Sequence, residues 1–273
     1  MSDVVLVDVA DGVADVRLNR PEVMNAFNDE LFEALIEAGQ SLRSRPDLRA
    51  VVLSGEGRGF CAGLDRTSFA GQKSGGSLIP ADADGDPQRW GDLGVEGLLL
   101  GRGQKAVWVW RLIEVPVIAA VHGAAIGAGL QLALGADIRY ATGDAKLAAG
   151  EINWGLVPDM GGTQLLPALI GLDHARDLIY SGRTVRGDEA ARLGLVTAVF
   201  DDPLTAATDF ARNVAARNPQ AIRNAKALTA AAVPVASANL RAERRAMWET
   251  IGTPNQLEAV QANIERREPR FVD

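Results

Sequence analysis

Cysteine and histidine are scarce in this sequence. Its 273 residues include one cysteine, Cys61, and two histidines, His122 and His174. A single cysteine cannot form an internal disulfide, and it cannot supply a zinc site that needs several thiolates. The two histidines form no paired ligand motif, so neither a His-rich metal site nor a His-based catalytic triad is expected.

Long apolar runs and an excess of basic residues are also missing. No segment approaches the 18 or so consecutive apolar residues of a bilayer-spanning helix, so no membrane partner is expected. The segment from Met1 to Val5 has no basic stretch leading into an apolar one, which favours a cytoplasmic protein. The net charge of −7 argues against a broad nucleic-acid surface, although a few local donors can still hold a small anionic ligand.

Several common catalytic signatures are absent as well. The sequence has no Gly-x-Ser-x-Gly elbow and no Gly-Lys-Ser/Thr phosphate loop. Gly55-Glu56-Gly57-Arg58-Gly59 resembles a dinucleotide loop but lacks the full spacing and a helix start after it. Esterase, P-loop and Rossmann chemistry are therefore not expected.

Strand and helix patterns alternate along the first 200 residues, which predicts an α/β fold. Strands are expected at Val4–Val9, Val13–Asn19, Ala50–Ser54, Val115–Val121 and Ile138–Ala141. A helix should begin after an N-cap at Asn28, a second should cover about 95–113, and a long loop should span Ser68–Gln88. After Asp201 only helices are predicted, near 203–217, 219–233 and 236–265, the last broken at Gly252-Thr253-Pro254.

Two turns made of small residues follow predicted strands, Gly59–Asp65 and His122–Gln131. The first N–H groups of a helix have no partner within it, and glycine or alanine lets a ligand oxygen come close to the backbone. Each turn alone also fits an ordinary tight connection between a strand and a helix. Together, the two turns favour a site that binds an oxygen anion.

Several motifs, in order from about residue 20 to 265, resemble the crotonase (enoyl-CoA hydratase/isomerase) family. The matching segments are Leu18–Phe27, Gly59–Asp65, His122–Gln131, Leu156–Thr163, Ser181–Arg183 and Gly194–Val196. The resemblance implies a ClpP/crotonase-type spiral of ββα units with a C-terminal helical region. Residues 1–200 would form the core with the acyl-CoA site, and residues 201–273 a helical oligomerisation region. It also implies homotrimers, or dimers of trimers, and no metal or cofactor beyond the CoA of the thioester substrate.

The same resemblance implies roles for residues of the two turns. The backbone N–H groups of Leu64 and Ala128 would form an oxyanion hole for the thioester oxygen. Further contacts to the substrate or its CoA would come from Ala62, Gly63, Arg66, Gly127 and Gln131. Leu64 is alternatively a residue that shapes the acyl pocket, and Arg66 is alternatively a solvated surface arginine.

The carboxylates distinguish among reactions within the family. The family's hydratases use two glutamates, and Gln131 stands where the first is expected, whereas Glu151 matches the second. Glutamine cannot exchange a proton at neutral pH. Glu151 and Asp159 instead resemble the catalytic pair of the family's dienoyl-CoA isomerases, although either residue alone also fits a surface or turn carboxylate.

The resemblance therefore implies an enzyme that acts on an unsaturated acyl-CoA through a stabilised enolate, and the carboxylates favour double-bond isomerisation. Water addition by Glu151 alone is the first alternative. Another crotonase reaction, such as hydrolysis, decarboxylation or ring opening, is the second. A non-catalytic acyl-CoA-binding paralogue is the alternative from another functional class.

Overall fold

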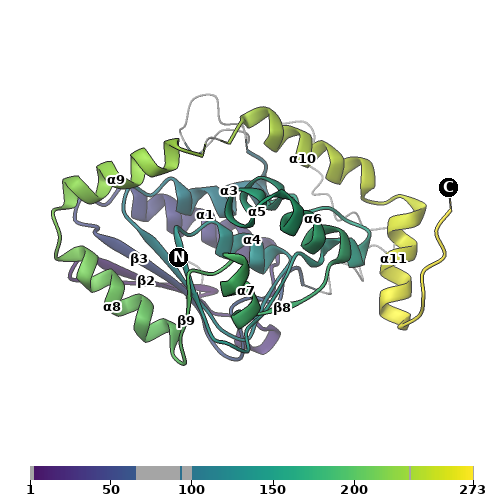
Figure 1. The fold of residues 1–273 in the computed structure, drawn as a ribbon, viewed down its shortest axis with the longest axis horizontal. Helices are drawn as coiled ribbons and strands as arrows, with labels where there is room; N and C mark the ends of the chain where they lie inside the picture. The colour runs from purple at the N-terminus through teal and green to yellow at the C-terminus, as the bar shows by residue number, and fades with distance from the viewer. Residues whose placement is uncertain (1–2, 66–92, 94–99, 234, 273) are drawn as a thin grey trace.

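A six-stranded sheet lies at the centre of the computed structural model, which describes residues 3–65, 93, 100–233 and 235–272 (Figure 1). Its strand order is β1-β2-β3-β4-β6-β9. The strands are β1 (Val5–Ala10), β2 (Val13–Leu18), β3 (Ala50–Gly55), β4 (Val117–Val121), β6 (Ile138–Ala141) and β9 (Ala198–Val199). Within this sheet, β1 and β2 pair antiparallel, and the other described neighbours pair parallel. The turn between them places Asp11 and Gly12 at positive φ, as a tight hairpin requires.

A second, smaller sheet accompanies the first. It contains β5 (Ala124–Ile126), β7 (Lys146–Ala148) and β8 (Val185–Arg186), in that order. Isolated bridges extend this layer from Ala125 to Cys61 and from Leu64 to Phe27. Successive passes of the chain thus add one segment to each layer, which is the predicted spiral.

The two faces of the central sheet are covered by different helices. Val51 and Leu53 of β3 join the main core, whereas Ala50 and Val52 pack with helix α8 (Pro203–Ala215). This split follows from the alternation of side chains along a strand. On the main-core side lie α1 (Asp29–Arg43), α3 (Arg102–Arg111) and α4 (Ala128–Leu134) (Figure 1). The predicted cap of α1 is confirmed, since Asn28 Oδ1 accepts a hydrogen bond from Leu31 N–H at 2.9 Å.

Short elements connect the two sheets to the C-terminal region. They are the 3-10 turns η1 (Pro21–Val23) and η3 (Gly150–Trp154) and the helices α5 (Gly162–Ile170), α6 (Leu172–Ser181) and α7 (Gly187–Leu193). Strand β5 was not predicted, because its residues lie within the small-residue run in which only a helix start was expected. The predicted loop Ser68–Gln88 and the first part of the predicted helix at 95–113 lie outside the described residues.

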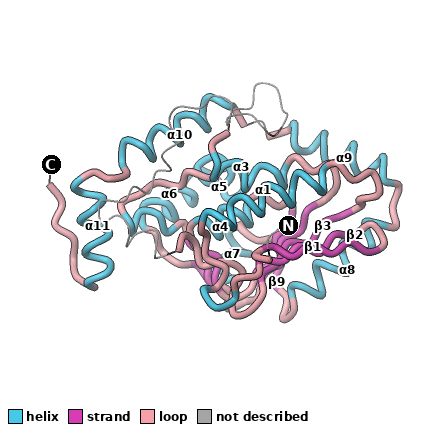
Figure 2. Tube along the Cα trace, turned by 180° about the vertical axis from the view of Figure 1, so that it is seen from behind, coloured by secondary structure: helices cyan, strands magenta, loops and turns pink. Residues whose placement is uncertain are grey.

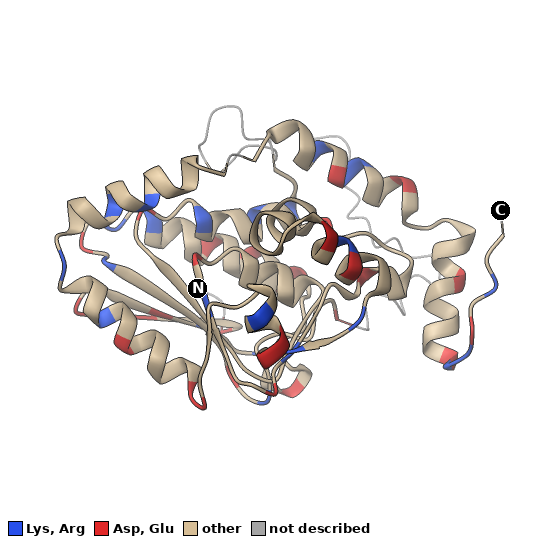
Figure 3. Ribbon diagram, viewed as in Figure 1, with Lys and Arg blue, Asp and Glu red and all other residues tan. Residues whose placement is uncertain are grey.

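The C-terminal helices occur where the sequence predicts them. They are α8, α9 (Pro219–Ala231), α10 (Ser237–Thr250) and α11 (Pro254–Glu265), with the expected break between the last two. Helix α10 contacts α5 and α11 contacts η3, so both helices reach elements that follow β7 in the chain. Figures 1 and 2 show α10 and α11 at the end of the molecule opposite α8 and α9. Acidic and basic residues alternate along α10 (Figure 3). The oligomerisation role of residues 201–273 stays a prediction.

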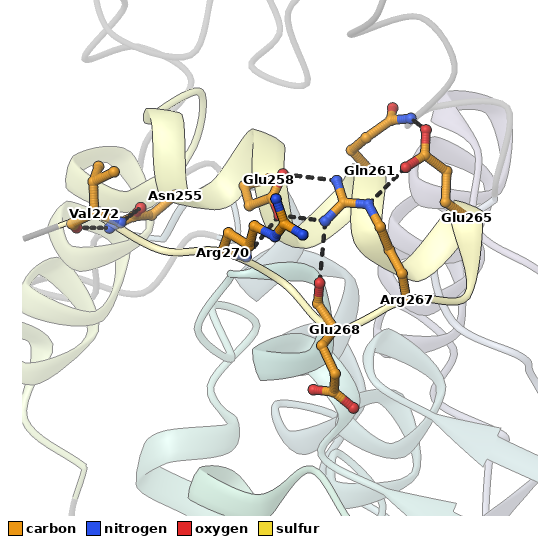
Figure 4. Close-up of polar contacts among 8 residues, drawn as sticks. All are labelled: Asn255, Glu258, Gln261, Glu265, Arg267, Glu268, Arg270 and Val272. Atoms are coloured by element: carbon orange, nitrogen blue, oxygen red, sulfur yellow. Dashed lines mark hydrogen bonds and ion pairs between the residues drawn. The ribbon is translucent and has the colours of Figure 1, made fainter.

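The last residues fold back against α11 (Figure 4). Glu258 accepts from the Arg267 guanidinium at 2.5 and 2.9 Å and from the Arg270 N–H at 2.7 Å. Asn255 exchanges two hydrogen bonds with the backbone of Val272. These bonds and charges hold the pKa of Glu258 well below its usual range, at about 2. Within the described part of the chain, no helix combines the length and apolarity of a membrane span.

Candidate active site

The first predicted turn, Gly59–Asp65, forms backbone hydrogen bonds with Phe27 and with strand β5. Phe27 donates its N–H to Gly63 O at 2.7 Å and accepts from Asp65 N–H at 2.9 Å. In such a parallel bridge, the intervening residue Leu64 directs its own N–H to the opposite side. Three residues earlier, Cys61 pairs with Ala124 and Ile126 of β5, so the turn runs from β5 toward Phe27.

The second predicted turn ends where helix α4 begins. Gly127 has φ 54° and ψ −118°, a backbone conformation that residues with a Cβ rarely adopt. Its N–H donates to Ala148 O at 2.8 Å, and its carbonyl accepts from Gln131 N–H at 2.9 Å. Ala128 is the first residue of the helix, so its N–H has no intrahelical acceptor.

The two turns meet at Gly63. A Cβ built on Gly63 would lie 2.7 Å from the carbonyl oxygen of Ile126 and 3.9 Å from the amide nitrogen of Ala128. Among the described residues, no acceptor is found for the N–H of Leu64 or of Ala128. The structure therefore brings both predicted donors into one region, while their binding of an oxygen anion stays a prediction.

Of the other predicted substrate-binding residues, all but Arg66 lie among the described residues. Ala62, Gly63 and Gly127 lie in the two touching turns, and the Ala62 N–H is bound to Met24 O at 2.9 Å. Arg66 lies outside the described residues. Gln131 lies one turn into α4, and its side chain is buried.

A fully buried asparagine, Asn25, anchors the first turn. Its Nδ2 lies 2.9, 2.9 and 3.1 Å from the carbonyl oxygens of Glu56, Gly59 and Phe60, and its Oδ1 accepts from Arg20 N–H at 2.8 Å. Its role was not predicted, although Asn25 belongs to the matching segment Leu18–Phe27. Asn25 thus holds the chain just before the residues that carry the Leu64 N–H.

Replacing Asn25 with Asp is expected to lower the free energy of unfolding by at least about 3 kcal/mol, because buried carbonyl oxygens lose their donor and face a charge. Asp tolerates the positive φ of 56° at this position, so the backbone should adapt. Denaturant titration measures the change. The matched control is Asn28→Asp, which keeps the acceptor oxygen of the α1 cap and should shift stability by less than about 0.5 kcal/mol. Equal effects at both positions would contradict the assigned role of Asn25.

Glu151 is a buried carboxylate next to the second turn. A Cβ built on Gly127 would lie 3.3 Å from its Oε1, and that oxygen accepts from Gln131 Nε2 at 2.7 Å. No hydrogen-bond partner is found for its buried Oε2 within the described structure. Burial raises the pKa of Glu151 to about 7, with the bond from Gln131 opposing the rise. A carboxylate with one free oxygen and a pKa near neutrality is suited to proton transfer.

The Gln131 amide has a fixed orientation. Its Oε1 accepts from the N–H groups of Met160 and Gly162, each at 2.9 Å. The –NH₂ end must therefore face Glu151, where it donates and cannot accept. Gln131 consequently joins Glu151 to the segment that follows Asp159.

Asp159 is the second predicted carboxylate, and it is half-buried. Burial is the largest cause that raises the pKa of Asp159 to about 7; the charges of Glu243 and Glu151 add to the rise, and Arg244 opposes it. Glu151 therefore lies close enough to Asp159 for its charge to raise the pKa of Asp159. Both retain a proton more readily than ordinary surface carboxylates.

Glu243 of α10 is a buried residue of this region whose place here was not predicted from the sequence. Its side chain accepts hydrogen bonds from Gln104, Gly161 and Thr163. A sequence signal existed, because a charged residue interrupts the helical series Leu240, Glu243, Met247, in which an apolar residue is expected. In the described ranges, no group of three or more His, Cys, Asp or Glu side chains is placed to hold a metal ion.

Comparison with known protein families gives one match over most of the chain. The family model described as enoyl-CoA hydratase/isomerase matches residues 8–81 and 103–273. The matched ranges include both turns, Glu151 and Asp159.

Individual relatives carry two kinds of name. The chain is 35% identical to a probable enoyl-CoA hydratase of Mycobacterium leprae, covering 99% of this chain and 98% of that protein. It is 33% identical to the mitochondrial Δ(3,5)-Δ(2,4)-dienoyl-CoA isomerase of Mus musculus, covering 95% of this chain and 79% of that protein. A crystal structure of an enoyl-CoA hydratase/isomerase from Pseudoalteromonas atlantica T6c superposes with a TM-score of 0.82 at 29% identity, covering 99% and 100% of the two chains.

Proposed function

This chain belongs to the enoyl-CoA hydratase/isomerase family, and on that premise we propose that it moves a double bond within an unsaturated acyl-CoA. The observation that carries the proposal is the pairing of Glu151 with a fixed amide, Gln131, instead of a second acid. A further acid, Asp159, also has a pKa of about 7, and the charge of Glu151 is among the causes that raise it.

In the proposed reaction, the thioester oxygen is held by the N–H groups of Leu64 and Ala128. Donors aimed at a developing negative charge stabilise the enolate more than the ground-state carbonyl, because the charge is larger in the enolate. The touching turns at Gly63 and Ile126 support a shared site for one oxygen atom. The CoA moiety enters as part of the substrate.

Glu151 then acts as the base that removes a proton from the carbon next to the thioester. Its orphan Oε2 is free to approach that carbon, while Oε1 is held by Gln131. Gln131 cannot supply a proton or activate water as an acid or base, which removes one partner that a two-glutamate hydration needs. The negative charge of the enolate spreads over the conjugated chain instead.

Asp159 completes the proposed cycle as the acid that protonates the distal end of the conjugated system. Its pKa of about 7 lets a fraction of the molecules carry the proton at neutral pH. The substrate loses one proton to Glu151 and gains one from Asp159, so no water is consumed. The enzyme returns to its starting state when Glu151 releases its proton to solvent and Asp159 takes one up. A conjugated dienoyl-CoA is the substrate class that suits two separate carboxylates.

Water addition by Glu151 alone is the second candidate function. It is favoured by the name of the Mycobacterium leprae relative, a probable enoyl-CoA hydratase. In that reaction the same carboxylate both activates the water and returns a proton to the carbon next to the thioester.

A panel of 2-enoyl-, 3-enoyl- and 3,5-dienoyl-CoA thioesters of equal chain length tests the proposal. We expect products of unchanged mass with the double bonds shifted toward the thioester, and the greatest kcat/KM for the 3,5-dienoyl-CoA. Chromatography with mass spectrometry separates these products from 3-hydroxyacyl-CoA, which is heavier by one water. Preferential water addition to 2-enoyl-CoA would support the second candidate. Tight binding without turnover of any substrate would identify a non-catalytic binding protein.

A further inference from the structure

The buried carboxylate of Glu243 is not used by the proposed reaction, yet it contacts the site. Glu243 belongs to helix α10, and only 5% of the residue is exposed. Oε2 accepts from Gln104 Nε2 at 2.9 Å and from Gly161 N–H at 2.8 Å. Oε1 accepts from Thr163 N–H at 3.2 Å and from Thr163 Oγ1 at 2.7 Å.

These four donors match an ionised carboxylate and leave it little capacity for a reacting group. Gln104 is itself fixed, because its Oε1 accepts from Gly101 N–H and its Nε2 also donates to Leu240 O. Glu151 differs in this respect, since its Oε2 has no partner among the described residues. Glu243 is therefore suited to hold a charge in place and not to exchange a proton with substrate.

Glu243 and Gln131 together bind four consecutive backbone N–H groups. Gln131 Oε1 accepts from Met160 and Gly162, and Glu243 accepts from Gly161 and Thr163. The two side chains thus alternate along the segment 160–163 that begins helix α5. This segment directly follows Asp159, so its position determines where the Asp159 carboxylate points.

The charge of Glu243 also acts on the proposed catalytic pair. It raises the pKa of both Asp159 and Glu151. The other charged groups that act on Asp159 are Glu151 from η3 and Arg244 from α10, the latter in the opposite direction. Burial raises the pKa of Glu243 itself, and its hydrogen bonds oppose that rise.

We propose that Glu243 is a positioning residue that, with Gln131, fixes segment 160–163 and thereby couples helix α10 to Asp159. The proposal rests on the proposed isomerase function for its kinetic consequences. Its structural consequences are independent of turnover. Glu243 touches no substrate atom in this account, so it acts only through Asp159 and the backbone of segment 160–163.

Glu243→Gln is the central test, since it keeps the size of the side chain and removes the charge. We expect kcat to fall about tenfold and both limbs of the pH profile of kcat to move to lower pH by roughly one unit. The direction follows because Glu151 and Asp159 lose a neighbouring negative charge. The matched control is Glu249→Gln, an exposed residue of the same helix, which should leave kcat and both limbs unchanged.

Thr163→Val separates positioning from charge, because it removes one hydrogen bond to Glu243 and keeps the carboxylate. We expect kcat to fall roughly threefold with both limbs in place, since the charge near Asp159 is retained. If Glu243→Gln does not fold, Thr163→Val becomes the test of the proposal. A kcat equal to that of the wild type in Thr163→Val would then overturn it.

Carboxyl ¹³C NMR titration of Asp159 gives a readout that does not depend on activity, with Asp159→Asn used for assignment. The titration midpoint should move to lower pH in Glu243→Gln and stay in Glu249→Gln. If Glu243→Gln changes neither the titration midpoint of Asp159 nor the pH profile of kcat, the proposed role of Glu243 is overturned. If wild-type protein isomerises no acyl-CoA while the midpoint still moves, the proposed function fails and the coupling of Glu243 to Asp159 stands.

Discussion

Replacement of Glu151 by Gln is expected to lower kcat by at least about a thousandfold, because the variant has no base to take the proton from the carbon next to the thioester. Acyl-CoA binding should persist. The two turns are untouched, and an amide oxygen at position 151 can still accept the 2.7 Å bond from Gln131. The wild-type rate should pass through a maximum near pH 7, since the proposed reaction needs Glu151 ionised and Asp159 protonated.

The same substitution should stabilise the fold at alkaline pH. Burial raises the pKa of Glu151 from its ordinary value of 4.5 to about 7. The folded wild type therefore loses stability as the pH rises from 4.5 through 7, on the order of 2–3 kcal/mol, because the charge is buried at a cost. Glu151→Gln removes this loss above pH 7.

Steady-state kinetics, calorimetric titration with acyl-CoA and denaturant unfolding at pH 5 and pH 8 measure the three effects. Glu249→Gln makes the same chemical change on the surface of α10 and should leave all three unchanged. Wild-type turnover by Glu151→Gln would refute the assignment of the base. A stability gain without loss of turnover would mean that Glu151 is a buried carboxylate outside the reaction.

The second large effect is expected at Gly63, where the two turns meet. An added methyl group in Gly63→Ala would lie 2.7 Å from Ile126 O, and the residue has φ +95°, so the turns must separate. If the N–H groups of Leu64 and Ala128 share one oxygen, separating them should reduce kcat/KM by about 10²–10³, the effect of losing one such donor. Kinetics with the preferred substrate of the panel measure the loss.

Gly252→Ala is the matched control for backbone strain. Gly252 also has a positive φ, +74°, but nothing lies within 4 Å of an added Cβ. This variant should lose about 1 kcal/mol of stability and keep full activity. If Gly63→Ala resembles Gly252→Ala in both respects, the close approach of the turns has no role in the reaction.

Local sequence patterns predicted most elements of the fold. Asn28 as a helix cap, the hairpin at Asp11-Gly12 and the helix break at Gly252-Thr253-Pro254 depend on neighbouring residues, and the structure has all three. The short strand β5 was missed because small residues between Gly123 and Gly127 carry no strand signal. Its pairing with β7 depends on a segment 22 residues further along the chain, since Ala124 pairs with Lys146.

The candidate site was predictable in its residues but not in its connections. The turns, Glu151 and Asp159 were identified by resemblance to a family. The orientation of Gln131 depends on Met160 and Gly162, and the burial of Glu243 depends on Gln104 and Gly161. These contacts join segments that are distant in sequence, and no local pattern determines which buried side chains will meet.

The place of α8 and α10 in the chain has a consequence for synthesis on the ribosome. Helix α8 already covers the second face of the central sheet, whereas Glu243 arrives only with α10. Because domains are made from the N-terminus onward, a nascent chain can bury its sheet before segment 160–163 receives its last two acceptors. An unfinished polypeptide that stops short of α10 would then be compact while the backbone after Asp159 still lacks the acceptors of Gly161 and Thr163.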